Sequence, residues 1–181
     1  MAVADTLAYY YPEREPLILA GLLHDVMEDA NVAVEELEAR FGPQVATLVH
    51  AVSKDDVAMM KALGASIEVL TQWKTEDEAK VILWRERRKY MLSHLESQGQ
   101  DPDTHRDILR LKAADAHANL VSIHRDLRNP MVGEGVWTRF KVGRVDSLWF
   151  YEKITAAVVR GLPGEQSAAD LDEALTAVRL A

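Results

Sequence analysis

The sequence predicts an all-α protein, and three observations support that prediction. Apolar residues recur three and four positions apart along most of the chain, which is the period of an amphipathic helix. No stretch alternates apolar and polar residues with period two between hairpin turns, as a half-buried strand would. Proline and glycine stand at the ends of most periodic segments, where they begin and end helices. We therefore expect a bundle of helices.

The first part of the chain should hold four helices bounded by proline and glycine. A first helix stops near Pro12, and Pro16 can occupy the first turn of the second because that position needs no N–H donor. Gly42 is placed to end a third helix, and Pro43 is placed to open a fourth. The expected ranges are 2–10, 17–29, 34–41 and 44–52.

The remainder of the chain contains longer helical segments. A charged stretch over 55–98 is helical in pattern but broken near Gly64 and around 74–77, so it should form two connected helices. A loop that contains Gly133 and Gly135 follows the next helix. The expected ranges of the last three helices are 104–127, 145–159 and 168–180.

Size and composition predict one domain. A chain of 181 residues with 48% hydrophobic residues can bury a core without disulfides or a structural metal. The turn sequence Gly161-Leu-Pro-Gly164 separates the last core helix from a terminal one. We therefore assign residues 1–161 to the domain and residues 162–181 to a C-terminal helical appendage.

Charge and composition disfavour or exclude several classes of function. The net charge of −8, with 28% charged residues, disfavours a surface built to neutralise nucleic-acid phosphates. The absence of cysteine excludes disulfides, thiolate zinc sites and a cysteine nucleophile, so any metal must be held by histidine and carboxylate. No apolar run approaches the roughly 20 residues of a membrane span, and no signal segment opens the chain, so a cytoplasmic protein is expected.

Reactive side chains gather on one side of the helix expected over 17–29. On a helical wheel His24, Asp25 and Glu28 lie opposite the apolar residues, with Asp29 at the border. His24 and Glu28 are one turn apart, as are Asp25 and Asp29, so an imidazole and three carboxylates can converge. A solvated helix face would show the same pattern. The nearly continuous apolar run 17–23 favours a buried helix instead, whose charges need a partner or a metal.

A second polar group lies on the helix expected over 104–127. Asp115, Asn119 and Ser122 share a face of that helix, and the surrounding alanines leave room for another helix to approach. This arrangement suits a metal ligand with a hydrogen-bonding neighbour. It equally suits a buried polar pair that bridges two helices, and the spacing alone leaves both interpretations open.

An ordered set of motifs resembles the HD-domain superfamily of metal-dependent phosphohydrolases. The likeness is to the hydrolase domains of RelA/SpoT-type alarmone enzymes and to small stand-alone bacterial HD proteins. The motifs are Leu-Leu-His24-Asp25-Val-Met-Glu28-Asp29, Glu35-Glu36-Leu37-x-x-Arg-Phe-Gly42, Val52-Ser-Lys54, Arg87-Arg-Lys-Tyr90, Leu-Lys-Ala-Ala-Asp115-x-x-x-Asn119, Trp137-x-Arg-Phe140 and Trp149-Phe-Tyr151. The resemblance covers about residues 2–159 and implies an all-α HD-domain helical bundle.

The resemblance also implies a divalent metal site. In that family the His-Asp pair and the distant aspartate bind the metal, usually manganese, together with a further histidine on the preceding helix. Carried over to this sequence, the ligands are His24, Asp25 and Asp115. A mixed imidazole and carboxylate shell suits Mn²⁺, with Fe²⁺, Zn²⁺ and Mg²⁺ as alternatives.

The same resemblance implies roles for four more residues. Glu28 and Asp29 would position and deprotonate the attacking water, and a carboxylate one turn from His24 suits a general base. Asn119 and Ser122 would contact the nucleotide.

The chain departs from the family pattern at two points. The family's first histidine precedes an Ala-Val-Ala segment that matches Ala2-Val-Ala4, so this ligand would lie upstream of Met1. Either the protein extends further upstream or it binds metal with one ligand fewer. Beside Asp115, where the alarmone enzymes usually carry arginine, this chain has Ala116, a departure that concerns the substrate rather than the metal. The remaining histidines, interpreted as surface or structural residues, are His50, His94, His105, His117 and His124.

The cationic run 85–89 and Lys112 allow two interpretations. They could bind or steer the phosphates of an anionic substrate, for which an acidic protein needs local positive charge. They could also form a solvated helix face with ion pairs to Glu86, which is the favoured interpretation for most of them. The large aromatic residues are interpreted as packing residues, namely Trp137, Phe140, Trp149, Phe150 and Tyr151.

Together these features predict a metal-dependent phosphohydrolase that acts on a nucleotide. Its most specific form removes the 3′-pyrophosphate of a (p)ppGpp-type guanosine alarmone, a version favoured by Glu28-Asp29 directly after the His-Asp pair. The alternatives are an HD phosphatase of another nucleotide or phosphoester, and a catalytically impaired HD module that senses or binds nucleotides. The expected partner is a small-molecule nucleotide, not a nucleic acid polymer or a membrane, and a homo-oligomer remains open.

Overall fold

The computed structural model describes residues 3–53, 64, 72, 74–96 and 101–181. All regular elements within these residues are helical, which confirms the predicted all-α fold. The elements are α1 (Val3–Tyr10), α2 (Glu15–Leu23), α3 (Val26–Asp29), α4 (Val34–Phe41), α5 (Pro43–Val52), α7 (Glu76–Glu96), α8 (Pro102–Leu127), the 3₁₀ helix η1 (Gly133–Arg139), α9 (Gly143–Gly161) and α10 (Gln166–Leu180).

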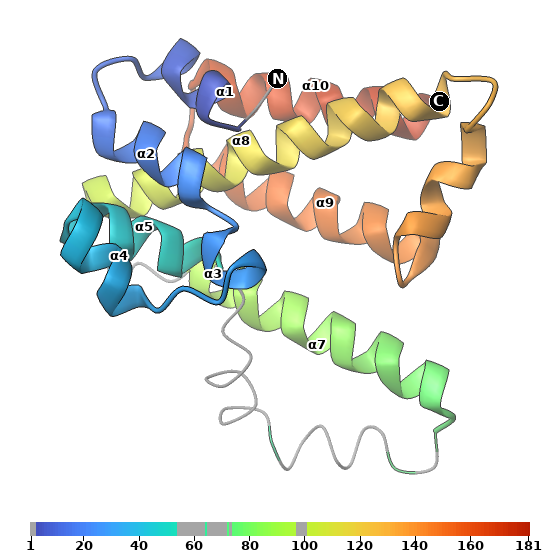
Figure 1. The fold of residues 1–181 in the computed structure, drawn as a ribbon. Helices are drawn as coiled ribbons and strands as arrows, with labels where there is room; N and C mark the ends of the chain where they lie inside the picture. The colour runs from blue at the N-terminus through green and yellow to red at the C-terminus, as the bar shows by residue number, and fades with distance from the viewer. Residues whose placement is uncertain (1–2, 54–63, 65–71, 73, 97–100) are drawn as a thin grey trace.

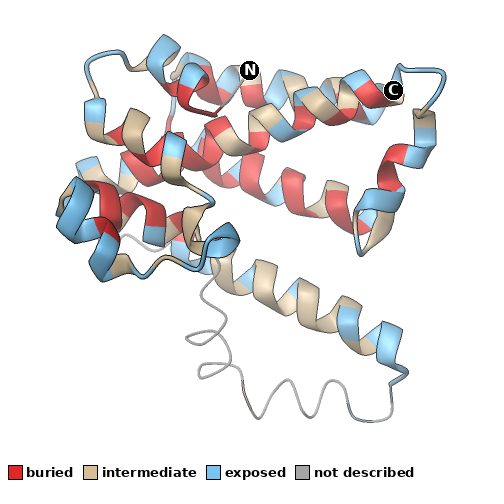
Figure 2. Cartoon of the chain, viewed as in Figure 1, coloured by how far each residue is buried: buried red, intermediate tan, exposed pale blue. Residues whose placement is uncertain are grey.

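Helix α8 is the central element of the bundle (Figure 1). Helices α9 and α10 pack along it, and α1, α2 and α5 also contact it. Buried residues concentrate where these helices face one another (Figure 2). Leu111, Leu120, Ile154 and Leu171 are almost fully buried and belong to one apolar core. This core fixes α8 and α9 relative to each other, and both helices contribute to the site described below.

Helix α8 begins earlier than the predicted position 104 because Asp101 caps it. The Asp101 carboxylate accepts hydrogen bonds from the backbone N–H groups of Asp103 and Thr104, both 3.1 Å long. Pro102 follows the cap, at a position where a helix needs no N–H donor. A capping aspartate and a first-turn proline therefore start this helix together.

The prediction of a single helix over 17–29 is wrong, because the chain turns at His24 and Asp25 between α2 and α3. Asp25 has φ −101° and ψ −1°, in the sparsely populated bridge region where many site residues are found. His24 keeps near-helical angles of φ −56° and ψ −30°. The interruption is therefore confined to one turn, and it places both side chains at the junction of two helices.

Two further predictions concern the segments around α7 and η1. Helix α7 begins at Glu76, in agreement with the predicted break around 74–77. The helix expected before that break lies outside the described residues, apart from Gly64 and Gln72. The predicted glycine loop after α8 forms the 3₁₀ helix η1, and its first residue, Gly133, has a φ of 49° that favours glycine.

Helix α7 lies along one edge of the bundle and contacts α9 (Figure 1). Leu92 and Leu95 are its buried residues, and most of its other side chains are partly or fully exposed (Figure 2). Trp84 packs edge-on against Phe150 of α9, with their ring centroids 5.8 Å apart. This aromatic contact turns one face of α7 toward the site.

The C-terminal helix α10 packs against both α8 and α9. Leu171, Leu175 and Val178 of this helix are buried in the common core. The predicted division at residues 161 and 162 stays a prediction about domain organisation. In the structure the last helix shares its apolar face with the rest of the bundle.

A buried ionic network joins α8 to the segments before α2 and before α10. Arg110, which is 8% exposed, donates two hydrogen bonds to Glu165, at 2.7 and 3.0 Å, and one to Asp107 at 2.9 Å. Arg14 donates to the other oxygen of Asp107 at 2.9 Å. The Tyr11 hydroxyl donates to Glu165 at 2.7 Å. The network therefore connects three segments that are far apart in the sequence.

Glu165 should make the stability of the fold dependent on pH. Burial opposes its ionisation, but hydrogen bonds from Arg110 and Arg106 outweigh burial and lower the pKa of Glu165 to about 2, from an ordinary 4.5. The folded state thus binds this proton less readily than the unfolded chain. The stabilisation is present above about pH 4.5 and is lost as pH falls toward 2, by about 3 kcal/mol in total. Urea unfolding between pH 6 and 2.5 measures it.

Glu165→Gln is the control for that measurement because an amide does not titrate. The unfolding free energy of the wild type should fall more steeply below pH 4.5 than that of the variant. Parallel curves for the two proteins would contradict this assignment.

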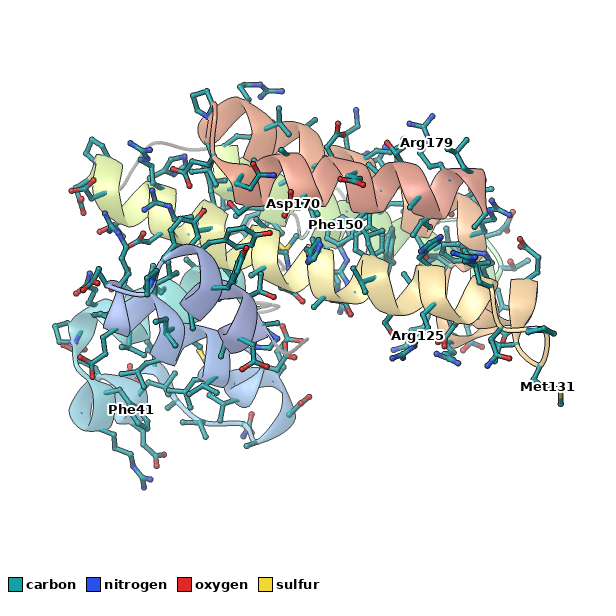
Figure 3. All side chains as sticks on the ribbon, turned by 90° about the horizontal axis from the view of Figure 1, so that it is seen from above. Phe41, Arg125, Met131, Phe150, Asp170 and Arg179 are labelled. Carbon is teal, nitrogen blue, oxygen red and sulfur yellow. The ribbon has the colours of Figure 1, made fainter. Side chains whose placement is uncertain are left out.

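The outer surface carries scattered apolar side chains. Phe41, at the end of α4, and Met131, after α8, lie at separate edges of the bundle (Figure 3) and are 41% and 91% exposed. Isolated exposed apolar residues are common on folded proteins. Among the described helices, none combines the length and the apolar character that crossing a membrane requires.

Candidate active site

A small cavity of about 190 Å³ lies where the junction of α2 and α3 meets α7, α8 and α9. Its wall brings together side chains that are nearly a hundred residues apart in the sequence. Five of the seven predicted site residues line it, namely His24, Asp25, Glu28, Asp115 and Asn119. The cavity is therefore the candidate active site.

The imidazole of His24 is oriented by the backbone of the preceding helix, α2. Its Nδ1–H donates to the carbonyl oxygen of Gly21 at 2.9 Å, and its Nε2 lies 3.0 Å from the Asp25 carboxylate. A backbone carbonyl on one ring nitrogen commonly presents the other nitrogen to a metal. The hydrogen bond to Asp25 raises the pKa of His24 above its ordinary value, although burial works against this shift.

The carboxylate of Asp115 is held by two neighbours on α8. Lys112 Nζ donates to one oxygen at 2.7 Å, and Asn119 Nδ2 donates to the other at 2.7 Å. The same amide also donates to the backbone carbonyl oxygen of Asp115 at 3.0 Å. Lys112 is only 7% exposed, so its ammonium group needs a negative partner. Spacings of three and four residues along the helix bring these groups together.

Glu28 lines the cavity one turn after His24. Its backbone N–H donates to the carbonyl oxygen of Asp25 at 3.0 Å, a hydrogen bond that belongs to the first turn of the short helix α3. Its carboxylate interacts electrostatically with the guanidinium of Arg88. Glu28 therefore contributes a carboxylate to the wall of the cavity.

The cavity offers suitable donors for a divalent metal. His24, Asp25 and Asp115 line it, and imidazole with carboxylate is a donor set that suits Mn²⁺ or Fe²⁺. Within the described residues, no three His, Asp or Glu side chains are already gathered around one point, and Asp115 is paired with Lys112 instead. The Lys112 ammonium thus supplies positive charge beside a carboxylate that could bind a cation. The residues fit a metal if Asp115 exchanges this partner for it.

Two predicted residues lie outside the cavity. Asp29 ends α3 as an exposed residue. Ser122 lies on α8, where Arg125 donates to its hydroxyl at 3.3 Å. The helical wheel puts Ser122 on the face of Asp115, but seven residues of helix separate them by about 10 Å along the axis. The roles predicted for Asp29 and Ser122 stay predictions.

The other histidines are not among the residues that line the small cavity. His50, His94 and His105 line a larger neighbouring cleft. His117 is partly buried on α8, and burial lowers its pKa. Among the described residues, His24 is the histidine that lines the small cavity.

Arg88 and Tyr151 also line the small cavity, although the sequence predicts other roles for them. From the sequence, the cationic run that contains Arg88 is interpreted mainly as a solvated helix face, and Tyr151 is interpreted as a packing residue. The helical spacing of Trp84 and Arg88, one turn apart, is the one signal that could have linked Arg88 to an aromatic surface. The position of Tyr151 depends on how α9 packs against α8, which periodicity along α9 does not reveal.

A larger cleft of about 1440 Å³ adjoins the small cavity. The two share Arg88, Phe150 and Tyr151 as lining residues. The walls of the cleft come from α4, α5, α7, α8 and α9 and from the segment around Phe140. Its volume exceeds the roughly 300–1000 Å³ typical of small-molecule pockets. A ligand whose reactive group enters the small cavity therefore has space for its remaining parts in the cleft.

Comparison with protein families gives a match to an HD domain over residues 1–97. The matched segment is more than half of the chain and contains the His24-Asp25 pair, Glu28 and Arg88. Asp115 and Asn119 lie beyond it on α8, where the structure joins them to the same cavity.

Short stretches of the chain are similar to guanosine-3′,5′-bis(diphosphate) 3′-pyrophosphohydrolases. The Vibrio cholerae protein of that name is 52% identical over 56 residues, which are 31% of this chain and 8% of that protein. The probable enzyme from Synechocystis is 50% identical over 40 residues, or 22% of this chain and 5% of that protein. The MESH1 pyrophosphohydrolase of Drosophila melanogaster is 37% identical over 68 residues, or 38% of this chain and 37% of that protein.

These alignments span much less than two thirds of each relative. With the family match, they support the prediction of a metal-dependent phosphohydrolase. A crystal structure of the protein lmo0812 from Listeria monocytogenes EGD-e superposes with a TM-score of 0.67, over 99% of this chain and 90% of that one. At 24% sequence identity, this similarity concerns the fold alone.

Proposed function

Because the chain belongs to the HD domain family, we propose that it is a divalent-metal-dependent phosphohydrolase that removes the 3′-pyrophosphate of a guanosine alarmone. The observation that carries the proposal is the gathering of His24, Asp25, Glu28, Asp115 and Asn119 around one cavity. The pyrophosphohydrolase names of its relatives favour this substrate over other nucleotides. A free nucleotide as substrate is consistent with a cytoplasmic location, which forms part of the proposal.

His24, Asp25 and Asp115 are the residues that would hold the metal, and Mn²⁺ is the ion we propose. A bound divalent ion acidifies a water molecule and offsets charge on a phosphoryl oxygen. The hydrogen bond to the Gly21 carbonyl oxygen fixes the His24 ring, which lines the cavity with its Nε2 beside the carboxylate of Asp25. Loading with Fe²⁺, Zn²⁺ or Mg²⁺ in place of Mn²⁺ tests the choice of metal.

The chain's own residues then handle the proton and the substrate. Glu28 takes a proton from the attacking water, whose oxygen forms the new bond to phosphorus. The bond from that phosphorus to the 3′ oxygen breaks, and the proton passes to the leaving oxygen. The products are pyrophosphate and a nucleotide with a free 3′ hydroxyl. Asn119 fixes the Asp115 carboxylate through its 2.7 Å hydrogen bond, and it contacts the nucleotide in this proposal, as Ser122 does further along α8. Asp29 supports Glu28 in positioning the water.

The direct test is hydrolysis of a nucleotide panel by protein supplied with Mn²⁺. The panel contains (p)ppGpp, nucleoside monophosphates, diphosphates and triphosphates, and a generic phosphoester. Release of pyrophosphate from (p)ppGpp supports the proposed reaction. Release of phosphate from another compound supports a phosphatase of different specificity, and no release from any compound overturns the enzyme proposal.

Metal binding gives a separate prediction for Asp115. Protein purified in Mn²⁺ should hold about one ion per chain, and Asp115→Ala should weaken Mn²⁺ binding by more than the 10- to 100-fold that follows loss of a residue supporting a ligand. Elemental analysis and calorimetry measure this. Asp103→Ala, an exposed aspartate in the first turn of the same helix, should bind metal like the wild type. Equal binding by the wild type and Asp115→Ala would contradict the ligand assignment.

A further inference from the structure

The guanidinium of Arg88 is held on two aromatic rings beside the small cavity. Its central carbon lies 4.4 Å from the centroid of Phe150 and 5.2 Å from that of Trp84. Stacking of this kind fixes the plane of a guanidinium and leaves the N–H groups at its edge able to donate hydrogen bonds. Arg88 lines both the cavity and the larger cleft, so it lies where the two spaces adjoin.

Among the described residues Arg88 has no acidic partner bonded to it, unlike Arg85 and Lys89 on the same helix. Arg85 donates to Asp146 at 2.6 Å, and Lys89 donates to Glu86 at 2.7 Å. Within the described part of the chain, Arg88 makes no hydrogen bond and no ion pair. Its guanidinium contacts the two aromatic rings instead. A partly buried cation without a bonded anion is costly, because it has lost water and gained no full replacement. The site therefore has an unused capacity to bind a negative group.

Tyr151 supplies a second donor at the same place. The residue is 8% exposed and lines the same two spaces as Arg88. In the part of the chain that the structure describes, its hydroxyl has no hydrogen-bond partner. Burial raises the pKa of Tyr151, and the charge of Asp115 adds to this while Arg88 opposes it. The phenol therefore keeps its proton near neutral pH and can donate it in a hydrogen bond.

We propose that Arg88 and Tyr151 form a binding subsite for a phosphoryl group of the substrate, between the small cavity and the larger cleft. The inference rests on the proposed function, which it deepens by assigning two residues to the recognition of substrate phosphate. Phosphoryl oxygens accept hydrogen bonds from guanidinium and phenol groups at the same time. The other cationic side chain that lines the cavity, Lys112, is already bonded to Asp115.

The charge balance of the cavity explains why such a subsite is needed. Asp25, Glu28 and Asp115 all line the cavity, and a phosphate brings further negative charge toward them. Arg88 interacts electrostatically with Glu28 and Asp115, so it lies close enough to offset this repulsion. The subsite thus favours a substrate that carries more than one phosphoryl group or a bulky group on its phosphate, since one part can react while the rest extends past Arg88 into the cleft.

The test measures binding of inorganic pyrophosphate to Mn²⁺-loaded protein by calorimetry. Arg88→Met should weaken binding by about 10- to 100-fold, because a charge-assisted hydrogen-bonding group is lost. Tyr151→Phe, which keeps the ring, should weaken binding by about fivefold, as expected for one neutral hydrogen bond. Arg88→Lys keeps the charge but not the planar stacking, so it should restore only part of the affinity.

Lys89→Met is the matched control, since Lys89 is exposed on the next residue of α7 and pairs with Glu86. It should bind pyrophosphate like the wild type. Circular dichroism and thermal melting show whether each variant is folded, and Arg88→Lys covers the case in which Arg88→Met unfolds. Wild-type affinity in folded Arg88→Met or Arg88→Lys, or no binding by the wild type, would overturn the subsite.

Binding and hydrolysis separate this inference from the proposed function. If the wild type binds pyrophosphate and Arg88→Met does not, the subsite is supported even when no nucleotide is hydrolysed. If the wild type hydrolyses (p)ppGpp while Arg88→Met retains both wild-type pyrophosphate affinity and wild-type KM, the subsite is wrong and the proposed reaction still holds.

Discussion

Glu28→Gln is expected to lower kcat for the proposed hydrolysis by about 10²- to 10⁴-fold and to leave metal content unchanged. Glu28 lines the cavity one turn beyond His24 but is not among the proposed metal ligands. Glutamine keeps the length of the side chain and loses the ability to take a proton from water. The loss should therefore appear in kcat, while binding of Mn²⁺ and of pyrophosphate is retained.

Steady-state kinetics with (p)ppGpp, together with elemental analysis of the purified variant, measure both parts of this expectation. Glu13→Gln is the control, because Glu13 is exposed in the turn before α2 and is not part of the cavity wall. It should retain wild-type kcat. A kcat loss in Glu28→Gln that is accompanied by an equal loss of metal would identify Glu28 as a ligand and contradict its role as general base.

Helical spacing indicated which side chains lie near one another, even where the predicted helix was wrong. The prediction of one helix over 17–29 failed at Asp25, yet His24, Asp25 and Glu28 still line one cavity. The reason is that the interruption lasts only one turn and His24 keeps helical angles. On α8, the four-residue spacing of Asp115 and Asn119 corresponds to the 2.7 Å hydrogen bond between their side chains.

The sequence did not reveal which side chains of different helices contact one another. The sequence places Arg85 and Arg88 in the same cationic run, and it does not reveal that Phe150 from α9 packs against Arg88 while Arg85 pairs with Asp146. Tyr151 becomes a cavity residue for the same reason. Periodicity states which face of a helix is apolar, but it does not state which other helix that face meets. Ser122 lies outside the cavity for a different reason, because a wheel omits the distance along the axis.

The predicted division between residues 161 and 162 depends on a similar question of packing. Gly161-Leu-Pro-Gly164 does form the connection between α9 and α10, as a turn sequence should. The turn also places Glu165 against Arg110 in the middle of the bundle. An appendage that could be removed without consequence would not supply the main acidic partner of a buried arginine. The loss of unfolding free energy when this ionic contact is removed therefore indicates whether the last helix is part of the domain.

Arg110→Met is expected to lower the free energy of unfolding by about 3 to 5 kcal/mol. Arg110 is bonded to Glu165 and Asp107, and its guanidinium lies 4.6 Å from the ring centroid of Tyr11. Methionine preserves much of the packing but leaves the buried carboxylate of Asp107 and the partly buried carboxylate of Glu165 without their shared cation. Arg14 still pairs with Asp107, and for this reason we expect a value near the lower end of the range.

Urea unfolding at pH 7 tests this expectation against a surface arginine. Arg179 lies on α10 (Figure 3), and Arg179→Met removes its exposed ion pair with Glu152 of α9, in which the nitrogen and oxygen are 3.6 Å apart; this should cost less than about 1 kcal/mol. The double variant Arg110→Met with Glu165→Gln should regain part of the lost stability, because one buried charge is then removed together with its partner. If Arg110→Met were no more destabilising than Arg179→Met, the contact with Glu165 would not secure α10, and residues 162–181 would behave as the separate appendage that the sequence predicts.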